Sequence, residues 1–493
     1  MNKMLVRVML LCITTATSVS AGVLEPFSGL GSDRPTLTAE QIQARSERLQ
    51  ASTTFSLLRF PEALQAPRRI FNPTIWRVIE RAAREYDLDP MLLAGMIFIE
   101  SYGDPLAKSP TGPAGIAQLT KGSARELGLS TNKRIKVSAP GKKTRYRTID
   151  ERYVPERAIM AMARRVSNRR AWLGGKIDFA VAEYHMGAGR MATLLSAYFD
   201  RTVKVSSVAG EMRNSTVSYE VLFWSNTPYF RPAVYKMLDE LNRVDYSPTY
   251  YFRVQQAMRL LEMYRRSPAE YARAASAHQG RPNWQWTFVS DADAAAVPVR
   301  SFGELQEEMG HRFVLLPDIA FDFGVRSSAS DRSMMAAERS TIGSALFIAH
   351  HLKRLQGERF SGFEIDGMLM HEGEEEDALP VHRLGWAFDV PAGGLSKTDQ
   401  RDLKFILTDL RHAGLLAYVE EGSEPTFHVV RHPDHAARFE QFYWDVMGGS
   451  VPVAPPRLAS HADEAPADNR RPRMLVAVAG FFSRMYSFLA SVG

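Results

Sequence analysis

Every residue from Met91 to Ile99 is apolar, which predicts a helix buried on nearly all of its sides. Asp89 and Pro90 precede this run. The aspartate side chain can cap free backbone amides, and the proline ring fits the first helical position. The turn residues Gly103–Pro105 indicate where the helix ends.

Glu100 stands on the last turn of this predicted helix. Desolvation and the negative end of the helix dipole both favour the protonated carboxyl group, which is the form that a general acid needs at neutral pH. A solvated charge at a helix end is the ordinary alternative. Two later segments favour the chemical interpretation: the loop Ser109–Gly115, rich in turn residues, and the helix-like run Ala180–Arg190, which ends on glycines.

These segments resemble the lytic transglycosylase family, whose catalytic domain has a goose-type lysozyme-like fold. The resemblance is carried by Glu100-Ser101, by the run Gly115–Leu119, and by Tyr184 with its following Gly187-Ala188-Gly189. It implies a mainly α domain in which Glu100 is the catalytic acid. By the same resemblance, Ser101 and Gln118 position the sugar and Tyr184 reaches toward the acid. Two positions depart from the family pattern: Ala117 replaces a usual Met, and His185 replaces a usual Asn that binds substrate.

The implied reaction needs one carboxyl group. Glu100 would protonate the oxygen between N-acetylmuramic acid and N-acetylglucosamine. The resulting carboxylate would take the proton of the sugar's own 6-hydroxyl, which closes a 1,6-anhydro ring. The alternative is a muramidase-type hydrolase with a second carboxylate, for which Asp150 and Glu183 are the candidates. A non-enzymatic peptidoglycan-binding scaffold is a further alternative.

A second constellation lies between Arg312 and Asp445. His382, Asp389 and His428 offer two imidazoles and one carboxylate, a donor set that suits zinc and leaves a coordination position for water. The spacing His-x2-Gly-x-Ala-x-Asp resembles the D-alanyl-D-alanine carboxypeptidase family of zinc peptidases. The resemblance implies an α+β domain in which Arg326 binds a substrate carboxylate or carbonyl oxygen.

This second region departs from its family at the general base. The family's glutamate usually stands three residues before the last histidine, and this chain has Pro425 there. Glu424, one residue earlier, is the candidate base. An odd displacement along a strand turns a side chain to the opposite face. The sequence therefore favours a zinc site over full peptidase activity, with binding of peptide stems as the alternative.

The length of 493 residues suggests two or three domains. The net charge of +6 and pI near 9.2 favour an anionic polymer or membrane surface as partner, and no nucleic-acid motif is evident. We expect peptidoglycan as the partner and a periplasmic location. The expected organisation is a signal peptide (1–21) containing the single cysteine, an N-terminal segment (22–67), a transglycosylase-like domain (68–275), a linker (276–310), a zinc-peptidase-like domain (311–447), a flexible linker (448–473) and an amphipathic helix (474–493).

Three further segments have open interpretations. The last helix is expected on a membrane surface, with membrane spanning or partner binding as alternatives. The basic segment Lys133–Arg147 predicts a hairpin at the cleft edge, which is either a solvated loop or a grip on anionic stems or glycan. The aromatic residues between Phe223 and Phe252 are either core or sugar-stacking residues.

Overall fold

The computed structural model describes residues 37–136, 146–279, 301–310, 312–327, 335–369, 380–421 and 426–448; the side chains of 380 and 418–421 are not described. These residues form two units, one within Thr36–Pro282 and one within Asn283–Ser491. The predicted signal peptide, the C-terminal helix 474–493, nearly all of the linker 448–473, and Glu424 lie outside the described residues.

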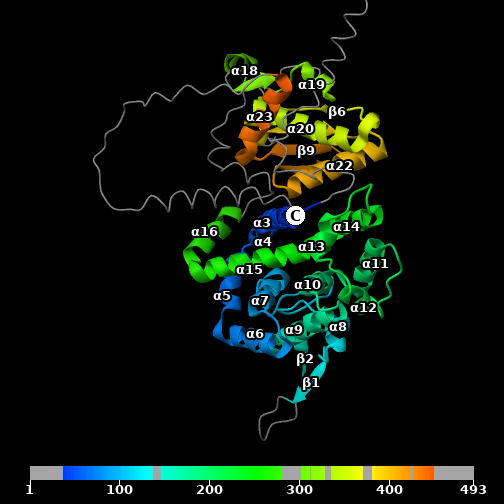
Figure 1. The fold of residues 1–493 in the computed structure, drawn as a ribbon. Coiled ribbons are helices and arrows are strands. Elements are labelled where there is room, and N and C mark those ends of the chain that lie inside the picture. The colour runs from blue at the N-terminus through cyan, green and yellow to red at the C-terminus, as the bar shows by residue number, and fades with distance from the viewer. Residues whose placement is uncertain are drawn as a thin grey trace, which may run out of the picture. The chain divides into compact units, whose positions relative to one another are not determined.

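The first unit is helical apart from one hairpin (Figure 1). Its α-helices are α3 (Ala39–Ser52), α4 (Thr54–Leu58), α5 (Glu62–Ile70), α6 (Pro73–Tyr86), α7 (Pro90–Ser101), α8 (Lys121–Glu126), α9 (Pro155–Trp172), α10 (Ile177–Met186), α11 (Ala188–Phe199), α12 (Val208–Arg213), α13 (Tyr219–Trp224), α14 (Pro232–Val244), α15 (Tyr250–Arg266) and α16 (Pro268–His278). Two 3-10 helices, η3 (Glu151–Tyr153) and η4 (Ser247–Thr249), complete the described helices.

The predicted apolar helix is α7. Its N-cap residue Asp89 accepts a hydrogen bond from the Met91 amide at 2.8 Å, as expected. The helix packs closely against α15, and Gly95 makes this approach possible. A Cβ atom at position 95 would lie 2.8 Å from Met258 Cγ and 3.0 Å from the Val254 carbonyl oxygen. The contact fixes the first residue of α15, Tyr250, relative to the last turn of α7.

The helical unit begins before the predicted boundary at residue 68. Helix α3 starts after a capping box at Thr38 and packs against α13 and α15. Trp224 Nε1 donates to Ser46 Oγ at 3.0 Å, and Gln256 Nε2 donates to Thr54 Oγ1 at 2.9 Å. These contacts join residues that the sequence assigned to a separate segment, because buried hydrogen bonds between distant parts of a chain leave no pattern in the sequence.

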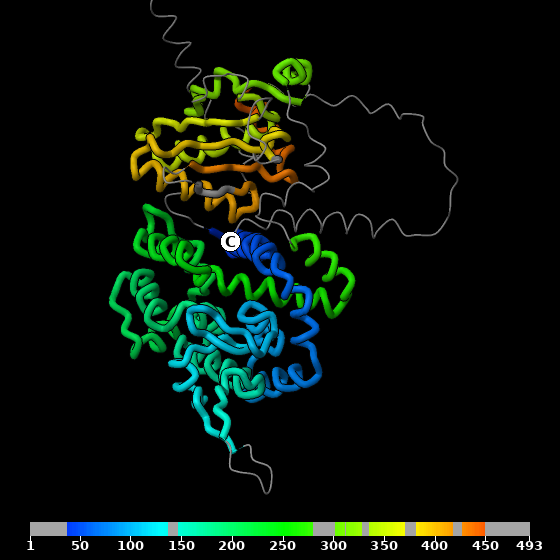
Figure 2. The backbone as a smooth tube through the Cα atoms, turned by 180° about the vertical axis from the view of Figure 1, so that it is seen from behind, coloured from blue at the N-terminus to red at the C-terminus, as the bar shows by residue number. Residues whose placement is uncertain are grey.

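The basic segment forms the predicted hairpin. Strand β1 (Lys133–Lys136) pairs with β2 (Tyr146–Ile149) in an antiparallel two-stranded sheet, with Lys136 opposite Tyr146. The hairpin extends away from the helices of its unit in both views (Figures 1 and 2).

The second unit is α+β. Its strands are β3 (Phe313–Leu315), β4 (Val325–Ser327), β5 (Ala336–Glu338), β6 (Phe363–Ile365), β7 (Ala387–Pro391), β8 (Leu416–Glu421) and β9 (Thr426–Arg431). Its helices are α18 (Phe302–Glu308), α19 (Ile319–Asp322), α20 (Arg339–Gln356), α21 (Pro380–Arg383), α22 (Lys397–His412), α23 (Ala436–Met447) and the 3-10 helices η7 (Gly357–Arg359) and η8 (Pro433–His435). Helix α18 lies inside the predicted linker, where Leu305 packs on Phe313, Ala336 and Leu369.

The strands β7, β9 and β8 form an antiparallel sheet in that order, while β3 pairs with β5 and β4 runs parallel to β6. The yellow to orange strands run side by side in Figure 2. A bridge between Asp366 and Asp389 joins the end of β6 to β7. Helix α20 supports the unit by packing on α23, where a Cβ at Gly343 would lie 2.0 Å from the Phe439 carbonyl oxygen.

Among the described helices of both units, none combines the length and apolar character that a membrane crossing requires.

Candidate functional site

The helical unit contains a cavity of about 760 Å³ that Glu100 lines from the last turn of α7. Ser101, Gln118, Tyr184 and His185, the residues that the sequence assigned to substrate binding, line the same cavity. They come from α7, from the loop before α8, and from α10. The fold thus brings together all of the side chains that the resemblance assigned to the glycan-cutting site.

Glu100 has the environment of a general acid. Burial raises its pKa from 4.5 to about 7, although a hydrogen bond from Tyr250 and the charge of Arg165 act in the opposite direction. The Tyr250 hydroxyl donates to Glu100 Oε1 at 2.7 Å. At neutral pH the carboxyl group is therefore divided between its acid and its base form.

Tyr184 lies near enough to the acid for the Glu100 charge, after burial, to raise the pKa of Tyr184, but its hydroxyl donates to another group. Its hydroxyl donates to the Ala117 carbonyl oxygen at 2.8 Å, and its ring stacks on Tyr250 with centroids 6.4 Å apart. The sequence missed Tyr250 because this residue lies 150 positions after Glu100, within an aromatic stretch that mixes buried residues such as Phe252 with exposed ones such as Tyr229. The only available signal was that aromatic stretch itself.

His185 is a neutral ring that packs against two tyrosines. Its ring centroid lies 4.5 Å from that of Tyr246 and 5.1 Å from that of Tyr250, and its Nδ1 is hydrogen-bonded to Ser247 Oγ at 2.8 Å. Burial is the main reason that the pKa of His185 is lowered, so the imidazole is uncharged at neutral pH. An uncharged imidazole can still offer substrate a hydrogen bond.

Ser101 and Gln118 shape the cavity wall. The Ser101 hydroxyl donates to the Ile116 carbonyl oxygen at 2.8 Å, which ties α7 to the loop that carries Gln118. Gln118 has a left-handed backbone with φ of 43°, and its Nε2 donates to the Gly115 carbonyl oxygen at 2.9 Å. Both side chains thus hold the loop that forms one wall.

Neither predicted second carboxylate lines the cavity. Asp150 pairs with Arg152 at 2.7 Å. Glu183 is fully buried and lies 3.2 Å from Arg169 Nε and 3.8 Å from Arg165 Nη2. Each acid is therefore paired with a guanidinium group and is not part of the cavity lining.

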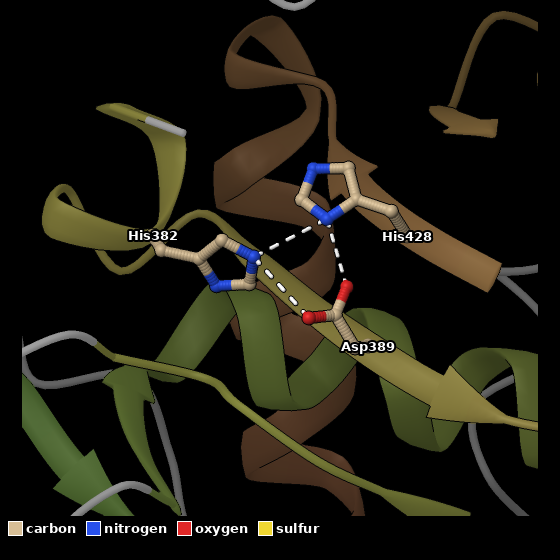
Figure 3. Close-up of side chains that lie close together, drawn as sticks. All are labelled: His382, Asp389 and His428. Atoms are coloured by element: carbon tan, nitrogen blue, oxygen red, sulfur yellow. Dashed lines mark hydrogen bonds and ion pairs between the residues drawn. The ribbon is translucent and has the colours of Figure 1, made fainter. Parts of the chain in front are cut away.

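The second unit brings His382, Asp389 and His428 together (Figure 3). One donor atom from each lies within 4.8 Å of the others. His428 Nδ1 is 2.8 Å from Asp389 Oδ1 and 3.2 Å from His382 Nε2. Tetrahedral zinc with bonds of about 2.0–2.1 Å places its ligand atoms roughly 3.3 Å apart, so this spacing fits the ion. Burial lowers the pKa of His382 to about 4, which favours the neutral imidazole that a metal requires.

Strand register places Arg326 on the same sheet face as Asp389 and His428 of this triad. Arg326 lies beside Glu364 in the parallel β4–β6 pair, and Asp366 follows two residues later on the same face. Asp366 is opposite Asp389, which is opposite His428. The guanidinium group of Arg326 is exposed and donates to the Ser361 carbonyl oxygen.

Asp366 is a residue that sequence reasoning missed. Its amide donates to the Asp389 carbonyl oxygen at 2.7 Å, and the reverse bond is 2.8 Å, so the two side chains project from one face as a hydrogen-bonded antiparallel pair. At Gly367 an added Cβ would lie 3.3 Å from Asp389 Oδ2, which shows how close this segment runs to the triad. Only the sheet pairing reveals this neighbour, since Asp366 precedes Asp389 by a long stretch of chain.

Comparison with known families agrees with the geometry of the first unit. The family model described as Transglycosylase SLT domain matches residues 77–204, which lie within the helical unit. Residues 77–204 of the helical unit are thus similar to that family of domains. The match includes Glu100 and Tyr184 and ends before Tyr250.

Among curated proteins, the chain is similar to membrane-bound lytic murein transglycosylase F 2 of Alkalilimnicola ehrlichii, with 31% identity over 125 residues, covering 24% of this chain and 23% of that protein. It is also similar to membrane-bound lytic murein transglycosylase F of Salmonella typhi, with 26% identity over 218 residues, covering 44% of this chain and 40% of that protein. The chain therefore spans less than half the length of these relatives.

Proposed function

We propose that the helical unit is a peptidoglycan lytic transglycosylase that cuts between N-acetylmuramic acid and N-acetylglucosamine. The observation that carries the proposal is the Glu100 carboxyl group, which faces the cavity with a pKa of about 7. The transglycosylase domain match and the names of the relatives support this substrate class.

In the proposed reaction Glu100 acts twice. Its proton passes to the glycosidic oxygen as the C1–O bond breaks, and the N-acetylglucosamine side leaves as an alcohol. The Glu100 carboxylate then accepts the proton of the muramic acid 6-hydroxyl, whose oxygen forms a new bond to C1. Glu100 ends protonated, so no water is consumed. A pKa near 7 suits both halves, because one group must donate and then accept a proton.

Product analysis separates this reaction from hydrolysis. Purified peptidoglycan sacculi are digested with the full chain, and the released fragments are weighed by mass spectrometry. Transglycosylase action gives 1,6-anhydro ends, which are lighter by one water than the reducing ends left by a muramidase. Fragments with reducing ends alone would favour hydrolysis, for which Glu62 and Asp104 are the other carboxylates lining the cavity. The absence of fragments from well-folded protein would favour the binding scaffold.

Glu100→Gln is the decisive variant, because it keeps the shape and removes the transferable proton. We expect no anhydro products from it. Glu183→Gln is the comparison variant, because Glu183 is a buried acid that does not line the cavity. Anhydro products from folded Glu100→Gln protein would remove Glu100 from the mechanism.

The second unit supports a second proposal, a zinc-dependent peptidase-like or stem-binding domain. His382, Asp389 and His428 would hold the ion, and a bound zinc would supply an activated water or a polarising charge. Arg326 would hold a substrate carboxylate or carbonyl oxygen from the same sheet face. The test is zinc content of the purified chain together with stem lengths of digested peptidoglycan, with and without chelator. Stems that shorten only without chelator would indicate peptidase activity, whereas zinc binding without shortening would indicate a binding domain.

The proposed place of action is the periplasm, at peptidoglycan and near a membrane. The relatives' names describe membrane-bound murein enzymes, which supports this location. Fractionation of cells expressing the full chain, with and without residues 474–493, tests membrane contact through that segment.

A further inference from the structure

The β1–β2 hairpin concentrates positive charge that the helical unit does not neutralise. Its eight described residues include Lys133, Arg134, Lys136 and Arg147 and no acid. Only Lys133 has an acidic partner, Glu151 at 2.9 Å. Among the described residues, no carboxylate pairs with the other three cations. Unpaired cations gathered on one element attract polyanions.

One face of the hairpin combines this charge with an aromatic ring. Arg134 is opposite Thr148 and Lys136 is opposite Tyr146, so these four side chains share a face, and all four are exposed. The Arg134 guanidinium carbon lies 4.7 Å from the Tyr146 ring centroid, and the tyrosine is 57% exposed. An open ring flanked by two cations suits a ligand that carries both sugar or amide planes and carboxylates.

The base of the hairpin is fixed to the wall of the Glu100 cavity. Directly after β2, the buried Arg152 pairs with Asp150 and donates to the carbonyl oxygens of Gly112 at 2.9 Å and Leu119 at 3.0 Å. The loop between these two carbonyls contributes Pro113 and Gln118 to the cavity lining. The hairpin is therefore held by the same loop that forms the cavity wall.

We propose that this cationic hairpin, with Arg134, Lys136 and Tyr146 on one face and Arg147 on the other, binds the anionic peptide stems of the glycan strand that enters the Glu100 cavity. The inference rests on the proposed function, because it takes the polymer in the cavity to be peptidoglycan. Free stem carboxylates would pair with the cations, and the tyrosine ring would pack on the planar groups of the stem. Such contacts outside the cavity increase affinity for the polymer without touching the bond that breaks.

The test measures binding of the full chain to insoluble sacculi by co-sedimentation, over a range of NaCl concentrations. Glu100→Gln is present in every protein, so the sacculi stay intact and binding is measured even if no cleavage occurs. The hairpin variant carries Arg134→Ser, Lys136→Ser and Arg147→Ser. The matched control carries Arg259→Ser, Arg266→Ser and Arg273→Ser, which removes the same charge from exposed positions of α15 and α16.

We expect the hairpin variant to bind sacculi on the order of tenfold more weakly at low salt, since each exposed charge contact contributes roughly 1.5- to 5-fold. Its affinity should also depend less on salt. The control should bind as the parent does. Sacculi whose carboxylates have been amidated should bind the parent and the hairpin variant equally.

Three outcomes would overturn the proposal: equal weakening by the control, no weakening by the hairpin variant, or an undiminished difference on amidated sacculi. Vesicles of phosphatidylglycerol and phosphatidylcholine distinguish a membrane-binding face. If the hairpin variant loses vesicle binding and keeps sacculus binding, the face contacts lipid and the proposal is wrong.

Circular dichroism and thermal melting confirm that each variant is folded. Failure of the proposed function would appear separately, as the absence of anhydro products from the chain with Glu100 intact.

Discussion

The Tyr250 hydroxyl lies 2.7 Å from Glu100 Oε1 and donates a hydrogen bond to it, although 150 residues separate the two in sequence. This bond favours the carboxylate form, while burial favours the acid form, and burial has the larger effect. The balance leaves the pKa of Glu100 at about 7. The close packing of α7 on α15 at Gly95 holds the pair in place.

Removing this hydrogen bond should weaken catalysis. In Tyr250→Phe the carboxylate loses its donor, so the pKa of Glu100 should rise further. A hydrogen bond to a charged group contributes about 1.5–3 kcal/mol, so we expect kcat/KM to fall by roughly 10- to 100-fold. The measurement is the rate of release of soluble fragments from sacculi. Tyr251→Phe, the next residue on α15, is the control; an equal loss there would point to a general disturbance of the helix.

The activity should depend on pH through Glu100. The acid form is required to protonate the glycosidic oxygen, and its pKa is about 7. We therefore expect kcat/KM to decline above about pH 7, by about tenfold per pH unit once the carboxyl group is ionised. In Tyr250→Phe this decline should begin at a higher pH. A decline at the same pH in both proteins would show that another group controls it.

Glu100→Gln should alter stability in a pH-dependent way. The folded pKa of about 7 is above the ordinary value of 4.5, so the folded state of the native protein binds a proton that the unfolded chain releases. The native protein should therefore lose stability as pH rises from about 4.5 to about 7, by at most about 3 kcal/mol. The glutamine variant lacks this loss. Denaturant unfolding should show that the free energy of unfolding of the variant, relative to that of the native protein, is higher at pH 8 than at pH 5.

Gly95→Ala should destabilise the helical unit. The new Cβ would lie 2.8 Å from Met258 Cγ and 3.0 Å from a backbone oxygen of α15, so the helices must separate. Overpacking of this kind costs about 1–3 kcal/mol, and activity should fall as Tyr250 moves from Glu100. Gly122→Ala on α8 is the control, because its Cβ has only one contact, at 3.7 Å. Unchanged thermal melting of Gly95→Ala would contradict the close packing.

Asp366→Asn should weaken zinc binding. Asp366 is outside the group of donor atoms within 4.8 Å, but the sheet pairing puts its side chain beside Asp389, where a second negative charge offsets that of a divalent ion. Residues that support a metal from outside its ligands change affinity by about 10- to 100-fold. The readout is competition with a chromophoric zinc chelator, with Glu364→Gln as the control two residues earlier.

Four outcomes of this zinc experiment distinguish the hypothesis of a metal site from the hypothesis that Asp366 supports it. Loss of zinc from His428→Ala would support the triad as the zinc ligands. Weak zinc binding by Asp366→Asn would support the role of Asp366 beside them. Normal binding by Asp366→Asn would contradict the role of Asp366 alone. A native chain that binds no zinc would contradict the metal site itself.

The sequence alone was sufficient to predict those features that depend on residues close together along the chain. The apolar run Met91–Ile99 predicted a buried helix, and its Asp89 cap predicted where that helix begins, because capping and periodicity act within a few residues. The motifs around Glu100 and Tyr184 identified the cavity residues. The charges of Lys133–Arg147 and their Pro-Gly turn indicated the hairpin.

Only the tertiary structure decided which distant residues meet. Tyr250 donates the hydrogen bond to Glu100, and Asp366 lies opposite Asp389. The packing of α3 on α15 likewise extends the helical unit beyond its predicted start. The physical reason is common to these cases: such pairs form when helices pack or strands pair across long stretches of chain, and local propensity carries no record of that geometry.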